Sequence, residues 1–150
     1  MQIQPDPVRL DANKAVARRF FIQLVNERRY ELIPEIFSSD VKLRVGTRGH
    51  LQDVGFDGHE GALKWLRLFH DSFSDCRDEI LGQWAEGDQV VTHICYRGTH
   101  DGVWMDQPAT GQKVIWTGIA INTIRGGKIV HMAGAIDQAD VFRQLGWLQA

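Results

Sequence analysis

The stretch VIWTGIAINTI, from Val114 to Ile124, decides the fold because it has the pattern of a β-strand that is apolar on both faces. Its even positions hold Val, Trp, Gly, Ala, Asn and Ile, and its odd positions hold only Ile and Thr. Successive side chains of a strand point to opposite faces, so both faces of this strand need cover. We expect one face to meet helices and a pocket, and the other to meet a second copy of the chain in a homodimer or a dimer of dimers.

The sequence around this stretch predicts a long antiparallel meander. Gly126-Gly127 is a two-residue hairpin signal, since glycine supplies the positive φ that such turns require. Glu86-Gly87-Asp88 is a similar tight-turn signal upstream. The four strands that these turns join in pairs are predicted at Arg77–Glu86, Gln89–Thr99, Gln112–Ile124 and Lys128–Ile136.

The first half of the chain is mainly helical in pattern. Apolar residues at helical spacing predict helices over Asn13–Arg29, with Asp11 as the N-cap, and over Glu60–Phe73. A short helix broken or capped at Pro34, a strand, a loop and a closing helix are predicted at Tyr30–Phe37, Val41–Val45, Leu51–Gly58 and Ala139–Leu148. Helices followed by a meander predict an α+β fold, with the helices on one face of a curved antiparallel sheet, in a single domain over residues 1–150.

Composition and charge exclude several classes of protein. The chain has 150 residues, 43% hydrophobic and 24% charged, which is the balance of one ordinary globular domain. A net charge of -2 and scattered Lys and Arg residues argue against nucleic acid and membrane surfaces as partners. The N-terminus MQIQPDPVRL has no apolar signal region, no apolar stretch is long enough to span a bilayer, and the two cysteines are too few for a disulfide framework. These features predict a cytoplasmic protein.

Several short stretches together resemble the SnoaL-like polyketide ester cyclases of the nuclear transport factor 2-like superfamily. They are AEGDQVV (Ala85–Val91), GTHDG (Gly98–Gly102), PATGQKVIWTGIAI (Pro108–Ile121), GGKIV (Gly126–Val130) and FRQLG (Phe142–Gly146). The resemblance covers nearly the whole chain and implies a cone-shaped α+β barrel with no metal and no organic cofactor. Family members of known activity close a polyketide ring by an intramolecular aldol reaction, and some relatives have been linked to hydroxylation of anthracycline-type intermediates.

The two proton-transferring residues of those cyclases are missing from this sequence. The family places a pocket histidine two residues after the Gly of its TGI strand, and an acid-base aspartate seven residues after the Gly of its GKI strand. The same count arrives here at Ala120 and Gly134. Neither side chain can move a proton, so we expect a poor aldol cyclase.

Asp137 and His100 are the nearest titratable replacements and are the candidate catalytic residues. A partly buried carboxylate at Asp137 can serve as a general base, but the Asp-Gln-Ala-Asp stretch that it begins is also a helix N-cap pattern. His100 ends a predicted strand, where it can act as an acid or base or hold the following loop by a hydrogen bond. The sequence alone leaves both alternatives open.

Residues with the same strand parity as Ala120 and Gly134 are the candidate pocket lining. A pocket lined by them is expected to be roomier and more apolar than that of a cyclase, although such residues also commonly fill a core. Trp104, in a loop, either covers the mouth of the pocket or anchors the loop. The predicted substrate-contacting residues are Trp104, Trp116, Ala120, Asn122, Met132, Gly134 and Ile136.

No metal or dinucleotide motif is present, since the six histidines lack ligand spacing and the glycines form neither a nucleotide fingerprint nor a phosphate loop. Three hypotheses remain. The first is a cofactor-free enzyme that modifies a polycyclic aromatic substrate, cyclase-like or hydroxylase-like. The second is a non-catalytic protein that binds a hydrophobic small molecule in the same pocket. The third is an interaction dimer whose pocket has no ligand.

Overall fold

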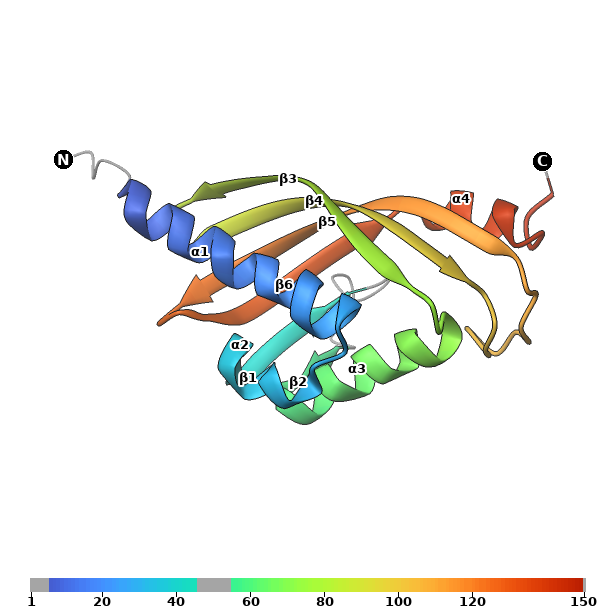
Figure 1. The fold of residues 1–150 in the computed structure, drawn as a ribbon, viewed down its shortest axis with the longest axis horizontal. Helices are drawn as coiled ribbons and strands as arrows, with labels where there is room; N and C mark the ends of the chain where they lie inside the picture. Colours follow the sequence, from blue (N-terminus) through green and yellow to red (C-terminus); the bar gives the residue numbers. More distant parts are fainter. Residues whose placement is uncertain (1–5, 46–54, 150) are drawn as a thin grey trace.

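A computed structural model describes residues 6–45 and 55–149 (Figure 1). A six-stranded sheet has the order β2-β1-β6-β5-β4-β3. The long strands arch over α3, and α1 lies along their inner face (Figure 1). The strands are β1 (Phe37–Arg44), β2 (Phe56–Asp57), β3 (Arg77–Glu86), β4 (Gln89–Thr99), β5 (Lys113–Arg125) and β6 (Lys128–Ile136). The predicted α+β class is confirmed.

The four strands of the meander lie at or within one residue of their predicted bounds, and the larger differences are in β1 and β2. Strands β3, β4 and β6 begin and end at the predicted residues, and β5 is shifted by one residue. The strand predicted at Val41–Val45 begins earlier, at Phe37, and the predicted loop Leu51–Gly58 contains the short strand β2. Residues 51–54 of that loop lie outside the described residues.

The predicted antiparallel sheet contains one parallel junction, where β1 pairs with β6. Parallel neighbours need a long connection between them, and here α3 and the whole meander supply it. Strand β1 pairs with the edge of β6 that β5 leaves free, and the other edge of β1 pairs antiparallel with β2. The sheet is therefore mixed and open, with β2 and β3 as its edge strands.

The first helix begins earlier than predicted. Helix α1 spans Pro7–Arg19, and the Asp6 carboxylate caps it by accepting from the Val8 amide at 3.1 Å. The predicted N-cap at Asp11 is wrong because Asp6 stands before a proline, and proline suits the first helical position. The predicted helix then continues as a π-helix, η1 (Phe20–Asn26), in which the Glu27 amide bonds the Ile22 carbonyl five residues back.

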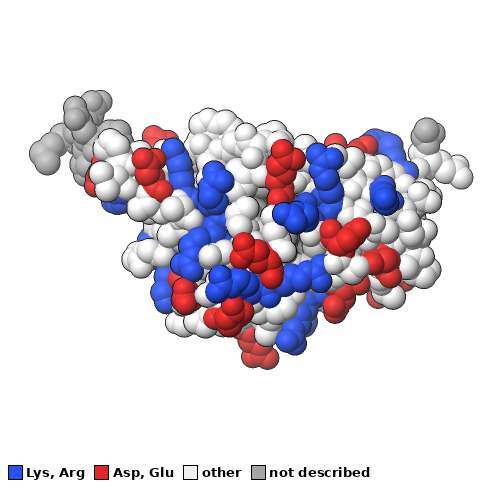
Figure 2. Space-filling view, in the orientation of Figure 1, with Lys and Arg blue, Asp and Glu red and all other residues white. Residues whose placement is uncertain are grey.

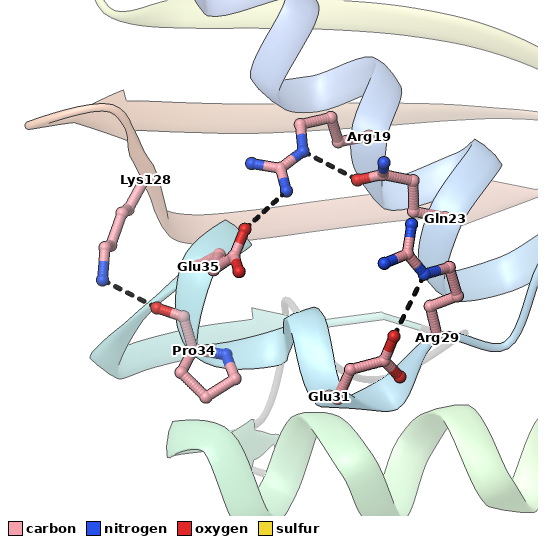
Figure 3. Close-up of polar contacts among 7 residues, drawn as sticks. All are labelled: Arg19, Gln23, Arg29, Glu31, Pro34, Glu35 and Lys128. Atoms are coloured by element: carbon pink, nitrogen blue, oxygen red, sulfur yellow. Dashed lines mark hydrogen bonds and ion pairs between the residues drawn. The ribbon is translucent and has the colours of Figure 1, made fainter.

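Polar contacts at the protein surface join α2 to α1 and to the β5–β6 hairpin (Figure 3). Arg19 donates to Gln23 at 2.7 Å within the same helical segment and to Glu35 at 2.9 Å in α2 (Ile33–Ile36). The Lys128 ammonium group donates to the Pro34 carbonyl at 2.7 Å, which joins α2 to the β5–β6 hairpin. Exposed pairs of this kind each contribute little stability, and their effect is to set the position of the segments that they connect.

The remaining helices follow the predicted plan with shifted ends. The segment with Pro34 begins as a 3-10 turn, η2 (Tyr30–Leu32), and ends as α2. Helix α3 covers Gly58–Ser72, close to the predicted bounds. The closing helix α4 is shorter than predicted, at Gln138–Gln144, and is followed by Gly146 at a φ of 75°, a conformation that favours glycine and ends the helix.

Strand β5 is covered on one face only. Its even positions are buried against the helices, while Ile115, Ile119 and Ile121 on the other face are 45%, 49% and 38% exposed. A second copy of the chain against this outer face stays a prediction.

The described part of the chain contains no helix long and apolar enough to span a membrane. On the face shown in Figure 2, basic and acidic side chains are interspersed. The expectation of no nucleic-acid and no membrane partner stays a prediction.

Candidate functional site

An apolar cavity of about 170 Å³ lies between the inner face of the sheet and the helices. Strands β4, β5 and β6 form one wall, and η1 and α3 form the other. Aromatic side chains dominate the lining, namely Phe20, Phe21, Trp65, Phe69, Tyr96, Trp104 and Trp116. A cavity with this lining favours a flat aromatic ligand.

Ala120 and Gly134 are the positions at which the family resemblance implies proton-transferring residues, and they are neighbours on adjacent strands of the cavity wall. Ala120 of β5 is the direct partner of Gly134 in β6, and both line the cavity. A Cβ atom at Gly134 would lie 3.4 Å from the Val45 Cγ1 atom, an ordinary contact, so the backbone has room for a side chain there. Two small residues therefore stand side by side on the cavity wall, and the loss of the cyclase pair stays a prediction.

Most of the predicted lining residues lie on the cavity wall. Those that do are Trp104, Trp116, Ala120, Met132, Gly134 and Ile136. Asn122 does not line the cavity; it is fully buried, and its amide group has no hydrogen-bond partner among the described residues. The role of these residues in binding a substrate stays a prediction.

Asp137 lies away from the cavity and caps α4. Its carboxylate accepts a hydrogen bond from the Asp140 amide at 3.0 Å, and the residue is exposed. The geometry matches the capping alternative, and Asp137 is not among the residues that line the cavity. The proposed catalytic role of Asp137 stays a prediction that this geometry does not support.

His100 is buried and anchors the loop that follows β4. The Thr110 amide donates to its Nδ1 atom at 3.2 Å, and the Thr110 hydroxyl lies 3.0 Å from the same nitrogen. Burial lowers the pKa of His100, which is packed against the rings of Phe73 and Trp147. Since His100 does not line the cavity, the structure places it as a neutral loop anchor, and its catalytic role also stays a prediction.

Asp78, at the start of β3, is the titratable cavity residue that sequence reasoning missed. It is only 7% exposed and lies on the cavity wall. Its Oδ1 atom has no hydrogen-bond partner among the described residues. Burial raises the pKa of Asp78 to about 8, because the charged form is not solvated there. At neutral pH this carboxyl group is therefore mostly protonated.

Asn26, the last residue of η1, fixes the backbone of Asp78. The Asn26 side chain donates to the Asp78 carbonyl at 2.9 Å and accepts from the Asp78 amide at 2.7 Å. These backbone groups point away from β4. Since β3 is an edge strand with no further strand beside it, they would be unpaired without Asn26. Asp78 and its β4 partner Tyr96 therefore form a non-hydrogen-bonded pair, the closer of the two antiparallel arrangements.

Tyr96 and Cys76 complete an uncharged group around this carboxyl. Burial raises the pKa of Tyr96 well above its ordinary value, and the neighbouring Cys76 and Asp78 raise it further. Burial likewise raises the pKa of the Cys76 thiol. The Tyr96 ring stacks on Trp116 with the ring centroids 4.3 Å apart. The site therefore presents a protonated carboxyl group beside a stacked aromatic wall.

A break in the strand pattern explains why Asp78 was missed. The β3–β4 register shifts between Ile80 and Gly82, so inward-facing residues change from even to odd positions along β3. The sequence RDEILGQWAE therefore shows no single alternating face. One short-range signal was available: Asp78 lies two residues before the apolar Ile80, so both side chains are expected on the same, inward face of the strand.

The described residues contain no cluster of three or more His, Cys, Asp or Glu side chains able to hold a metal ion. Among the described residues that line the cavity, Asp78 carries a carboxyl group and Tyr96 a phenol.

Comparison with known proteins identifies relatives of this fold. A family model described as SnoaL-like polyketide cyclase matches residues 15–145. A candidate SnoaL-like polyketide cyclase from Jannaschia sp. CCS1 superimposes with a TM-score of 0.84 at 17% identity, covering 99% of this chain and all of its own. AclR, a candidate hydroxylase from Streptomyces galilaeus, gives 0.77 at 23% identity over 93% of this chain and 99% of its own. IdmH, a candidate polyketide cyclase from Streptomyces antibioticus, gives 0.75 at 24% identity over 89% of this chain and 98% of its own.

At these identities the three structures show a shared fold and nothing finer. One curated protein, eukaryotic translation initiation factor 3 subunit I of Coccidioides immitis (strain RS), is 32% identical over 80 residues, which is 50% of this chain. The chain covers 23% of the length of that protein.

Proposed function

Because the chain belongs to the SnoaL-like polyketide cyclase family, we propose that it is a cofactor-free tailoring enzyme that holds an aromatic ring of its substrate in the cavity and exchanges a proton through Asp78. Three features support this proposal. The cavity is apolar and lined with aromatic rings, its wall carries a buried carboxyl group, and the site needs no further titratable residue to transfer one proton.

The state of the Asp78 carboxyl is the observation that carries the proposal. A general acid or base works best when its pKa lies near the operating pH, and burial brings the pKa of Asp78 to about 8. At pH 7 roughly one carboxyl in ten is ionised, so the group can both donate and accept a proton. Buried carboxyls with a strongly shifted pKa are concentrated at functional sites.

The proposed chemistry differs from aldol catalysis by a histidine-aspartate pair, since Ala120 and Gly134 occupy those positions. Cyclase-like and hydroxylase-like reactions both begin when an activated C–H or a phenolic O–H loses a proton. In the ionised form, Asp78 takes that proton onto a carboxylate oxygen and leaves the substrate as an enolate or phenolate. The cavity supplies desolvation and orientation.

The test compares wild type with Asp78→Asn on enolisable polyketide esters and on dihydroquinones, with products identified by mass spectrometry. We expect turnover to rise with pH with an apparent pKa near 8, because the base must be ionised. Asp78→Asn should lose about 10²–10⁴-fold in rate, the typical contribution of a positioned base. Asp137→Asn, at an exposed residue that does not line the cavity, is the matched variant and should keep the wild-type rate. Full activity in Asp78→Asn would refute the proposal.

A non-catalytic binding protein is the alternative that the cavity also supports. A wall that is almost wholly apolar and carries one protonated carboxyl can hold a hydroxyl-bearing aromatic molecule without changing it. Ligand binding that depends on Asp78, with no product formed from any substrate in the panel, would favour this alternative.

A further inference from the structure

The volume of the cavity limits the size of the ligand more narrowly than membership of the protein family does. Its volume is about 170 Å³. An apolar protein cavity of roughly 150 Å³ is filled by benzene. The enclosed space therefore holds one ring, or two fused rings that fill it closely, and a tricyclic or tetracyclic frame would extend beyond it.

A second hollow lies next to the cavity and is separated from it by aromatic side chains. This outer hollow, of about 230 Å³, lies between α3 and the Val103–Met105 part of the following loop. Its lining shares Trp65, Phe69 and Trp104 with the cavity. These three side chains form a partition between the two spaces.

Trp104 is the part of the partition contributed by the loop, and it is held firmly. Its ring centroid lies 5.3 Å from that of Phe73, 5.7 Å from that of Trp147 and 6.0 Å from that of Phe142. Its backbone amide donates to the Gln107 carbonyl at 3.0 Å, and the Gln107 amide donates back at 2.9 Å. Moving the Trp104 ring would break these contacts, and the three partly buried side chains of the partition pack against the hydrophobic core.

Hydrogen bonds at both ends of the loop also hold Trp104 in place. The Ser72 hydroxyl at the end of α3 donates to the Val103 carbonyl at 2.8 Å, one residue before Trp104. His100 and Thr110 close the base of the loop. Both ends of the segment that carries Trp104 are thus attached to the folded domain.

We infer that Trp104 determines ligand size, and that the ligand of this site is an aromatic compound of one or two fused rings bearing a hydroxyl group that meets Asp78. This inference deepens the proposed function and rests on it for the role of Asp78. Trp104 is a specificity-determining residue because it ends the space available to the ring system. Asp78 is the carboxyl-bearing residue among the described lining residues, and we assign to it the hydrogen bond that the hydroxyl needs on leaving water.

The experiment is a size series measured by calorimetry and thermal shift on the wild-type protein. The probes are phenol, 2-naphthol, 2-methylnaphthalene and 1-hydroxyanthraquinone. We expect 2-naphthol to bind at least tenfold more tightly than 1-hydroxyanthraquinone, and more tightly than 2-methylnaphthalene, which lacks the hydroxyl group. Equal or tighter binding of the three-ring compound would overturn the inference, and so would absence of binding by both phenol and 2-naphthol.

A variant pair tests the partition itself. Trp104→Ala joins the cavity to the outer hollow and should improve the affinity for 1-hydroxyanthraquinone at least tenfold. Val103→Ala, in the same loop but lining only the outer hollow, is the matched control and should leave the size limit unchanged. Trp104→Leu replaces Trp104→Ala if circular dichroism shows that the alanine variant is unfolded. An unchanged preference for 2-naphthol in the folded variant would contradict the role of Trp104.

These outcomes are independent of the catalytic test. A protein that shows the size limit but forms no product, or whose turnover does not depend on Asp78, would refute the proposed function and leave the size inference standing. A protein that turns over a three-ring substrate through Asp78 would refute the size inference and support the proposed function.

Discussion

Asp78 lies directly opposite Tyr96 in the β3–β4 pair, with its backbone amide and carbonyl bonded to Asn26 instead of to the neighbouring strand. This pairing brings a carboxyl and a phenol close together in a buried, apolar environment. Burial raises the pKa of both groups, so neither carries a charge at neutral pH for most of the time. The site is therefore organised from the edge of the sheet, where the pairing of β3 is completed by a side chain from a helix.

Replacing Asn26 should disturb this arrangement. Asn26→Ala leaves the amide and carbonyl of the buried Asp78 without partners, so we expect a loss of about 1–3 kcal/mol in the free energy of unfolding. Water admitted at the loosened edge should also lower the pKa of Asp78 from about 8 toward its ordinary value. Urea denaturation and carboxyl ¹³C NMR titration measure the two effects. The exposed variant Asp11→Ala is the control, and an unchanged pKa in Asn26→Ala would contradict the positioning role.

Protein stability should fall with rising pH because of Asp78. Its pKa is about 8 in the folded protein, against 3.8 for an ordinary aspartate, so between these values the folded state holds more protons than the unfolded state. The stabilising contribution is complete below pH 4 and is lost as the pH rises to about 8. Asp78→Asn removes this loss and should be more stable than wild type at pH 9, by a few kcal/mol. Denaturation curves at pH 5, 7 and 9 test this, and parallel pH profiles for the two proteins would contradict it.

The strand pattern predicted the meander well because glycine-containing turns join its strands in pairs and mark where they begin and end. The parallel pairing of β1 with β6 could not be predicted in the same way, since the two strands are far apart in sequence and no local residue pattern encodes parallel neighbours. The cap at Asp6 was missed because a helical stripe marks the middle of a helix better than its first turn.

The candidate site was predicted in outline only. Strand parity correctly placed Ala120 and Gly134 on the cavity wall, because β5 is regular there. Parity failed for the polar group that matters most, since a register shift in β3 hides the inward position of Asp78. The burial that raises the pKa of Asp78 comes from residues distant in sequence, and a single strand does not reveal it.

Restoring the cyclase pair should produce aldol cyclase activity in this frame. The backbone of Gly134 can accept a side chain, and Ala120 lies opposite it in the neighbouring strand. Ala120→His combined with Gly134→Asp should raise the rate of aldol ring closure of an enolisable polyketide methyl ester above that of wild type. Chromatography of the products compares the double variant with Ala120→His alone. The absence of a gain in a folded double variant would mean that the frame differs from that of the cyclases by more than these two residues.

The outer face of the sheet should form a homodimer. Trp84, Ile119 and Ile121 are exposed there and leave an apolar surface uncovered in a monomer. Light scattering at micromolar concentration should show a mass that is an even multiple of the 17.0 kDa chain. Ile121→Lys should shift the protein toward monomer because it buries a charge in the interface, while Ile115→Thr should have a smaller effect. A wild-type protein of 17.0 kDa would contradict the dimer.

The π-helix η1 also has an evolutionary consequence. Its hydrogen bonds span five residues, one more than those of the α-helix α1 that it continues, so an α-helical version of this segment would need one residue fewer. Removing one residue would rotate Asn26 by about 100° around the helix axis and take its amide away from Asp78. A one-residue gap at this point would therefore mark the lineages in which the buried carboxyl lost, or never had, its support.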